Sequence, residues 1–296
     1  MQAESSDIWV DIPENSSLFY VAHCLKKAGL IEKSWLFVTR VFLSGKRKKI
    51  KAGQYCFSPK MSYTQLMEHL LAGSIVLHKV CLPEGVTVTQ ALAILKRNPC
   101  LKGPLETCPP EGSLLPGTYY FPKGALRKNI VLRLQKAMTK ELASLAPFAG
   151  ELSAEDFLKL ASIVEKETRH SHEKGIIAGI FLKRLQKKIY LQADPTVIYG
   201  MTQGQSTLGR PLTRQDWNHD SPYNTYKNKG LPPTPICCPG KETLSSVAKA
   251  APSDFLFFVA LPDGTHAFNA TLDKHNQQIA QNKEQRSKHI NKLSRK

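Results

Sequence analysis

Apolar residues recur along the chain with two periods, which predict strands and helices in alternation. The segment IWVDIPENSSLFYVAHCLKKAGLI opens with alternating apolar and polar residues, as in a half-buried strand, and continues with apolar residues three and four apart, as on one face of a helix. Asn15 or Ser16 is the expected helix cap, and Gly29 the expected stop. This stretch therefore predicts a strand followed by a helix.

The same scheme returns in HKVCLPEGVTVTQALAILKRN. A strand is expected over 77–82, a turn over 83–85, and then a helix capped by Thr87 or Thr89. The intervening sequence predicts a strand and another helix that ends at Gly73. The repeated order of strand, "IPEN" or "LPEG" turn and helix suggests a duplicated small module.

Residues 99–124 are dense in Pro and Gly, which predicts a linking loop with short extended pieces and a domain boundary nearby. Beyond this loop, the periodicity predicts helices at about 128–144, 154–169 and 172–187, ordered loops after Leu191, a short helix at about 241–250, a hairpin with strands at 255–261 and 265–269, and a last helix. Ser153 is the expected cap of the second of these helices. The predicted fold class is α+β.

Composition narrows the function only a little. A hydrophobic content of 42% suits a packed core, and 41 Lys and Arg against 24 Asp and Glu give a net charge of +17. Such a surface attracts nucleic acid, anionic lipid or an acidic polymer, and charge does not choose among them. The basic tail over 283–296 has no apolar periodicity and is expected to be a solvated or frayed end.

The seven cysteines contain no CxxC pair, which disfavours a zinc ribbon or a thioredoxin-type site. Cys237 and Cys238 are adjacent, so a bond between them would be strained. No apolar run reaches the roughly 18 residues of a membrane span, and the first residues show no signal-peptide pattern. We therefore expect either a cytoplasmic chain or one whose membrane anchor is missing from this sequence.

Two carboxylates stand close together in ASIVEKET. A helix turns by about 100° per residue, so Glu165 and Glu167 point roughly 200° apart and are not a catalytic dyad with each other. Each borders the apolar stripe of its helix. Taken alone, the pattern favours solvated surface carboxylates, and one catalytic acid is the alternative.

Histidines offer weaker candidates. His170 and His172 follow the two glutamates, but the His-Glu-x-x-His spacing of a zinc site is absent and a continuing helix would turn the two rings apart. His266 and His275 are expected to be structural.

Two loop segments carry side chains suited to sugars, because Gln, Asn and Tyr offer neutral hydrogen bonds and flat faces. These residues are Gln192, Asp194 and Tyr199 in YLQADPTVIYG, and Tyr223, Asn224 and Tyr226 in SPYNTY. Pro195 is expected to force an extended or turned backbone. Ordered loop packing would explain the same residues without a ligand.

Four motifs in this order carry a family resemblance: LASIVEKET, RLQKKIYLQADPTVIYGM, SPYNTYKNKGLPPTPICCPG and FFVALPDGTHAFNATLDKHN. Over about residues 8–282 the chain resembles the YceG-like family of endolytic murein transglycosylases. The resemblance implies a LysM-like accessory region over 1–110 and a YceG-like catalytic domain over 111–296.

The resemblance also implies an activity: cleavage of peptidoglycan glycan strands between N-acetylmuramic acid and N-acetylglucosamine, with 1,6-anhydromuramic ends and an end to elongation of nascent strands. It implies a single-pass anchor in the bacterial inner membrane, with the enzyme in the periplasm or outside, and a penicillin-binding synthase as partner. Neither a cofactor nor a metal is expected, nor is nucleic acid as a partner.

Such an enzyme needs one carboxylic acid, because the attacking group is the substrate's own C6 hydroxyl. Glu165 matches the family's catalytic glutamate, and it must start protonated in an apolar, partly buried setting. The six loop residues would hold the sugars. Asp194 as a second carboxylate would give a hydrolase instead. A non-catalytic peptidoglycan-binding protein and a nucleic-acid binder are also compatible with the sequence.

Overall fold

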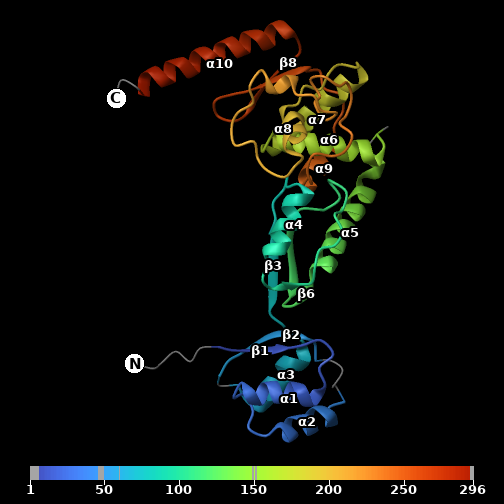
Figure 1. Cartoon of the computed structure of the whole chain (residues 1–296), viewed down its shortest axis with the longest axis vertical. Helices are drawn as coiled ribbons and strands as arrows, with labels where there is room; N and C mark the ends of the chain where they lie inside the picture. Colours follow the sequence, from blue (N-terminus) through green and yellow to red (C-terminus); the bar gives the residue numbers. More distant parts are fainter. Residues whose placement is uncertain (1–6, 46–49, 60, 149, 151, 294–296) are drawn as a thin grey trace. The chain divides into compact units, whose positions relative to one another are not determined.

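The computed structural model of the protein describes residues 7–45, 50–59, 61–148, 150 and 152–293 (Figure 1). Helices and small sheets alternate along the chain, in agreement with the predicted α+β class. Contacts group the chain into two compact units, Met1–Val80 with Leu95–Pro104 and Thr118–Asn129, and Cys81–Ile94 with Leu105–Gly117 and Ile130–Lys296. The predicted single division at residue 110, with accessory and catalytic roles, stays a prediction.

The first unit contains a small antiparallel sheet covered by helices. Strands β1 (Ile8–Ile12) and β2 (Gly53–Phe57) pair along their length, and α1 (Leu18–Lys27), α2 (Ser34–Leu43) and α3 (Tyr63–Ala72) lie on one side of that sheet in Figure 1. The alternation seen in the sequence is confirmed, because Val10 and Ile12 are buried whereas Asp11 is exposed.

Local signals determine most boundaries in this unit. Gly73 ends α3 in the left-handed conformation, as predicted, with a φ of 66°. The cap of α1 is Ser17, whose hydroxyl accepts the Tyr20 N–H, so the prediction of Asn15 or Ser16 was wrong by one or two positions. Helix α2 was not predicted, because its sequence SWLFVTRVFL is apolar on nearly every side and hides the helical period.

Short strands follow. β3 (Leu77–Leu82) pairs with β5 (Gly117–Pro122), and β4 (Leu101–Lys102) runs parallel to β6 (Ala125–Leu126). The Pro- and Gly-rich stretch thus forms short extended pieces, as expected. Helix α4 (Val88–Arg97) is capped by Thr87, whose hydroxyl accepts the Gln90 N–H at 3.3 Å.

The second unit is mainly helical and is built around one central helix. Its elements are α5 (Arg127–Leu145) from Ile130 onward, α6 (Ala154–Glu167), α7 (Ser171–Gln186), α8 (Asp194–Thr202), α9 (Lys241–Ala248), the hairpin of β7 (Phe257–Ala260) and β8 (His266–Asn269), and α10 (Leu272–Leu293). Helix α6 packs against α7, α8 and α9, and its Leu160, Ala161 and Val164 are fully buried. Ser153 caps α6 as predicted, accepting the Asp156 N–H at 3.0 Å.

Two segments differ from expectation. The stretch predicted to be a turned loop around Pro195 is helix α8; proline is compatible with the first turn, where its missing N–H costs nothing. The tail from Lys283, expected to be a solvated or frayed end, does not fray before Leu293 but continues α10, because it is rich in good helix formers even without an apolar stripe. Of the helices in the described ranges, none has the length and apolar character needed to cross a bilayer.

Candidate functional site

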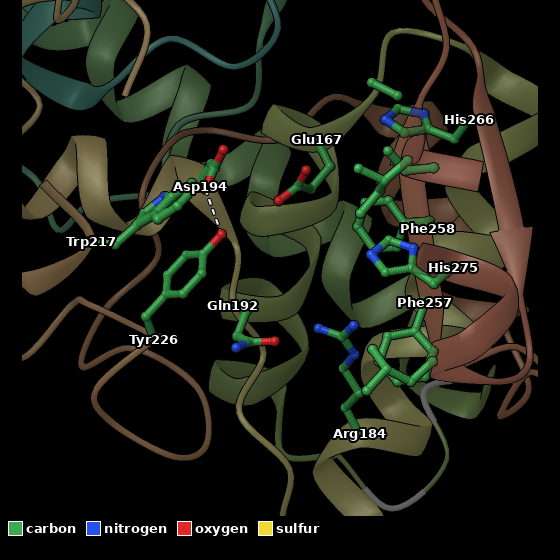
Figure 2. Close-up of a pocket in the computed structure, with 14 residues that line it drawn as sticks. Glu167, Arg184, Gln192, Asp194, Trp217, Tyr226, Phe257, Phe258, His266 and His275 are labelled. Atoms are coloured by element: carbon green, nitrogen blue, oxygen red, sulfur yellow. Dashed lines mark hydrogen bonds between the residues drawn. The ribbon is translucent and has the colours of Figure 1, made fainter. Parts of the chain in front are cut away.

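A cavity of about 470 Å³ lies in the second unit, where α6 and α8 meet the β7–β8 hairpin and α10. Its polar lining consists of Glu167, Arg184, Gln192, Asp194, Trp217, Tyr226, His266 and His275, and its apolar lining includes Phe257, Phe258, Leu272 and Ile279 (Figure 2). Polar groups converging on a concave, partly apolar surface are typical of a small-molecule or sugar site.

Glu167 is the last residue of α6 and brings an acid into this cavity. Its side chain is half-buried, and burial together with the negative charge of Asp194 raises its pKa to about 8, although the positive charge of Arg184 works in the opposite direction. A carboxyl group with that pKa keeps its proton at neutral pH. Glu167 therefore has the property required of a general acid.

Glu165, the predicted acid, faces a different part of the molecule. Its Oε2 accepts hydrogen bonds from the Gly240 N–H at 2.9 Å and from the Thr243 hydroxyl. Gly240 is the N-cap of α9, so Glu165 satisfies donors at the start of a neighbouring helix. Glu165 is not part of the cavity lining, and the two glutamates point into different surroundings, as the 200° separation requires.

Asp194, at the start of α8, holds an aromatic pair beside Glu167. Its Oδ1 accepts from the Tyr226 hydroxyl at 2.6 Å and from the Trp217 indole N–H at 3.0 Å. The two rings are stacked, with centroids 5.5 Å apart and planes 20° apart. Burial and the bond to Asp194 raise the pKa of Tyr226, so its hydroxyl stays a donor. The pair offers a flat face of the kind that sugar rings pack against.

Trp217 was missed in the sequence. It lies on a short 3₁₀ turn, Asp216–Asn218, which is anchored because the Asp216 carboxylate accepts from Arg210 at 2.6 and 2.9 Å and from the Thr213 N–H at 2.7 Å. The available signal was a lone tryptophan in the polar loop sequence RQDWN, since large aromatic residues on loops often serve binding.

Of the six predicted sugar-binding residues, the structure brings three into the cavity: Gln192, Asp194 and Tyr226. Tyr199 and Tyr223 lie outside its lining and contact each other, with ring centroids 4.9 Å apart. The Tyr199 hydroxyl donates to Glu111 at 3.3 Å, and the Tyr223 hydroxyl lies 2.9 Å from that of Thr234. Tyr199 lines a separate cavity of about 250 Å³, so the predicted contact of these two tyrosines with the sugar stays a prediction.

Asn224 is fully buried and cannot touch a ligand in the cavity. Its side-chain amide donates to the Trp217 and His219 carbonyls, at 2.9 and 2.8 Å, and its side-chain oxygen accepts the Tyr226 N–H at 2.9 Å. Asn224 thus holds the backbone of both stacked aromatic residues, which is a supporting position rather than the predicted direct contact.

The opposite wall carries positive and titratable groups. The buried guanidinium of Arg184 donates to the carbonyls of Leu256, at 2.8 Å, and Leu191, at 2.6 Å, and lies over the Phe257 ring. His266 and His275, which the sequence suggested were structural, both line the cavity. In Figure 2 the Glu167 side chain is drawn between Asp194 on one side and the two histidines on the other.

His170 and His172 do not lie on opposite sides of a continuing helix, because α6 ends before them and their ring centroids are 5.7 Å apart. Within the described residues, no group of three or more His, Cys, Asp or Glu side chains is arranged to hold a metal ion.

Over residues 10–281 the chain matches the model of the YceG-like family, and it belongs to that family. It is similar to a Bacillus subtilis (strain 168) protein named endolytic murein transglycosylase, with 30% identity over 90% of this chain and 82% of the relative. A Streptococcus pneumoniae (serotype 2, strain D39) protein of the same name is 28% identical over 93% of this chain and 58% of its own length.

Among solved structures, the chain is similar to a YceG-like protein from Listeria monocytogenes. The two share 30% identity and a TM-score of 0.57, and the match covers 93% of this chain and all of the other. The family fold therefore extends over nearly the whole sequence.

Proposed function

We propose that the protein is an endolytic peptidoglycan lytic transglycosylase, which cleaves the bond between N-acetylmuramic acid and N-acetylglucosamine and leaves 1,6-anhydromuramic ends. Family membership and the shared name of the relatives support the substrate class. The observation that carries the proposal is Glu167, an acid with a pKa of about 8 in a cavity beside a carboxylate and a stacked aromatic pair.

We assign the acid to Glu167 in place of Glu165. The reaction requires a carboxyl group that is protonated near neutral pH and lies among the sugar-binding loops. Glu167 meets both requirements, since it lines the cavity together with Gln192, Asp194 and Tyr226. Glu165 accepts two hydrogen bonds at the start of α9 instead.

In the proposed reaction, Glu167 donates its proton to the departing glycosidic oxygen, and the bond from that oxygen to the muramyl C1 breaks. Positive charge develops at C1, where the Asp194 carboxylate stabilises it. The C6 hydroxyl of the same sugar then bonds to C1 and loses its proton, which closes the anhydro ring. Trp217 and Tyr226 support the sugar face during these steps.

A glycan hydrolase is the second candidate, and the proximity of Asp194 to Glu167 favours it. Asp194 lies close enough for its charge to raise the pKa of Glu167, so attack by a water that two carboxylates activate is a second route. The hydrolase predicted from the sequence used Glu165 with Asp194, and the present geometry supports Glu167 in that pair.

Product mass tests the proposal directly. Purified murein is incubated with the protein and with Glu167→Gln, and the released ends are read by mass spectrometry. We expect anhydro ends, which are one water lighter than hydrolysed ends, from the unmodified protein only. Hydrated ends would instead establish a hydrolase, and binding without any cleavage would establish a non-catalytic glycan-binding protein.

The finer parts of the proposal rest on the resemblance. We propose that the first unit includes a LysM-like glycan-binding element, supported by the order β1, α1, α2, β2. We also propose action from a single-pass inner-membrane anchor, beside a penicillin-binding synthase, where cleavage ends the elongation of a nascent strand. Crosslinking in cells that make the protein should then capture such a synthase.

A further inference from the structure

A buried carboxylate and an imidazole form a pair on the hairpin wall of the cavity. Glu173, in the first turn of α7, has a side chain that is 1% exposed, and His266 on β8 has one that is 9% exposed. Glu173 Oε1 accepts the backbone N–H of His266 at 2.7 Å, and its Oε2 lies 2.8 Å from His266 Nδ1. Two contacts to one residue fix the ring against the wall.

The charge of Glu173 determines which nitrogen of His266 carries the proton. Burial favours the neutral carboxyl group, but the bonds from Thr168 and His266 outweigh it and lower the pKa of Glu173. An ionised carboxylate only accepts hydrogen bonds, so Nδ1 must be the protonated nitrogen. Nε2, on the other edge of the ring, is then the nitrogen available to a ligand in the cavity that His266 lines.

Glu173 also reaches the helix that carries the acid. Its Oε2 accepts the Thr168 hydroxyl at 2.6 Å, and Thr168 directly follows Glu167 as the C-cap of α6. One buried carboxylate therefore ties the end of α6 to strand β8. These contacts fix the positions of Glu167 and His266 relative to each other.

We propose that His266 is a further catalytic residue, which accepts the proton of the attacking hydroxyl. As Glu167 gives its proton to the departing glycosidic oxygen, the muramyl C6 oxygen bonds to C1 and its proton passes to Nε2 of His266. The step leaves Glu167 ionised and His266 protonated, and solvent returns the proton from one to the other. An imidazole oriented by a carboxylate is well suited to this transfer.

This inference rests on the proposed transglycosylase function, and it assigns to a second residue the deprotonation that Glu167 would otherwise perform. The two ideas are separable. Failure of the unmodified protein to cleave glycan strands would refute the function, whereas cleavage that needs Glu167 but not His266 would refute only this inference.

The test compares His266→Gln, Glu173→Gln and the control His172→Gln on purified glycan strands. Gln at 266 can still hydrogen-bond but cannot take a proton, and Gln at 173 can donate to Nδ1 and so imposes the wrong tautomer. We expect kcat to fall about 100-fold in both variants with KM within about threefold of normal. His172 is exposed on α7 outside the catalytic cavity, and its variant should be unchanged.

Rescue by added imidazole separates proton transfer from support of the fold. His266→Gly leaves a space for free imidazole, and we expect added imidazole to raise the kcat of this variant at least about tenfold. A melting curve checks each variant, and Glu173→Gln gives an independent result if substitutions at 266 do not fold. A kcat within about threefold of normal in folded His266→Gln, or no restoration by imidazole, overturns the proposal.

Discussion

The surroundings of Glu165 and Glu167 differ although the two residues are two positions apart on one helix. Glu165 meets an N–H and a hydroxyl at the start of α9, and its oxygen is used to hold two helices together. Glu167 meets an apolar cavity wall and the charge of Asp194, and it retains a proton. The comparison shows that neighbours, and not residue type or place in a motif, decide which carboxyl group keeps its proton, and the proposed catalytic role of Glu167 rests on this difference.

The largest expected effect separates the two glutamates by activity. Glu167→Gln removes the acid but keeps the size of the side chain, so the rate of glycan cleavage should fall at least about 1,000-fold. Glu165→Gln should stay within about tenfold of normal. The measurement is release of new glycan ends from purified murein; the reverse ranking would return the acid to Glu165.

A smaller effect concerns the pH dependence of the acid. Glu167 must be protonated to act, so kcat/KM should fall about tenfold per pH unit above about pH 8, and we call this fall the alkaline limb. In Asp194→Asn the like charge is gone, the pKa of Glu167 drops, and the fall should begin at a lower pH. Measuring the remaining kcat/KM of this variant from pH 6 to 10 gives the pH at which its alkaline limb begins.

Glu165→Gln is the matched control for this shift. Its substitution leaves Asp194 and the cavity lining intact, so the limb should stay where it is in the unmodified protein. If Asp194→Asn leaves the limb in place, or if Glu165→Gln moves it equally, Asp194 is not the charge that holds the proton on Glu167.

The smallest effect separates the glutamates by stability. Glu165→Gln loses a charge-assisted contact at a helix start, which should lower the free energy of unfolding by about 1 kcal/mol. Urea unfolding at a fixed pH measures this loss. A loss within error of zero would mean that the contacts to Gly240 and Thr243 contribute nothing.

Glu167→Gln should behave differently with pH. Because the folded pKa of Glu167 lies above its ordinary value of 4.5, the folded protein holds a proton that the unfolded chain releases, and stability declines as pH rises from about 4.5 to about 8. The variant lacks this decline, so its stability relative to the unmodified protein should be greater at pH 9 than at pH 5.

Local patterns predicted much of the fold and part of the site. The cap at Ser153 and the buried stripe of α6 are encoded within a few residues, and Gln192, Asp194 and Tyr226 were recognisable from their loop sequences. Helix α2 escaped because its apolar residues surround it, and α8 because its proline suggested a turn. Caps and periodic patterns involve residues only a few positions apart, so they do not predict contacts between distant segments.

The rest of the site depends on contacts between distant segments. Both glutamates border the apolar stripe of α6, so the choice between them requires knowing that α9 begins beside Glu165 and that α8 begins near Glu167. Likewise, the pairing of Glu173 with His266 joins residues 93 positions apart. No spacing rule within a helix or strand carries that information.

Trp217, which stacks on Tyr226, is an intrinsic fluorescent probe of the cavity. The sequence has three tryptophans, and the other two, Trp9 and Trp35, belong to the first unit, so replacing both with Phe leaves the emission to Trp217 alone. A sugar bound on the stacked rings would exclude water from the Trp217 indole and disturb its hydrogen bond to Asp194. The fluorescence of Trp217 would then change. The Glu167→Gln protein, which we expect to be inactive, would thus report the binding of an uncleaved strand without any attached dye.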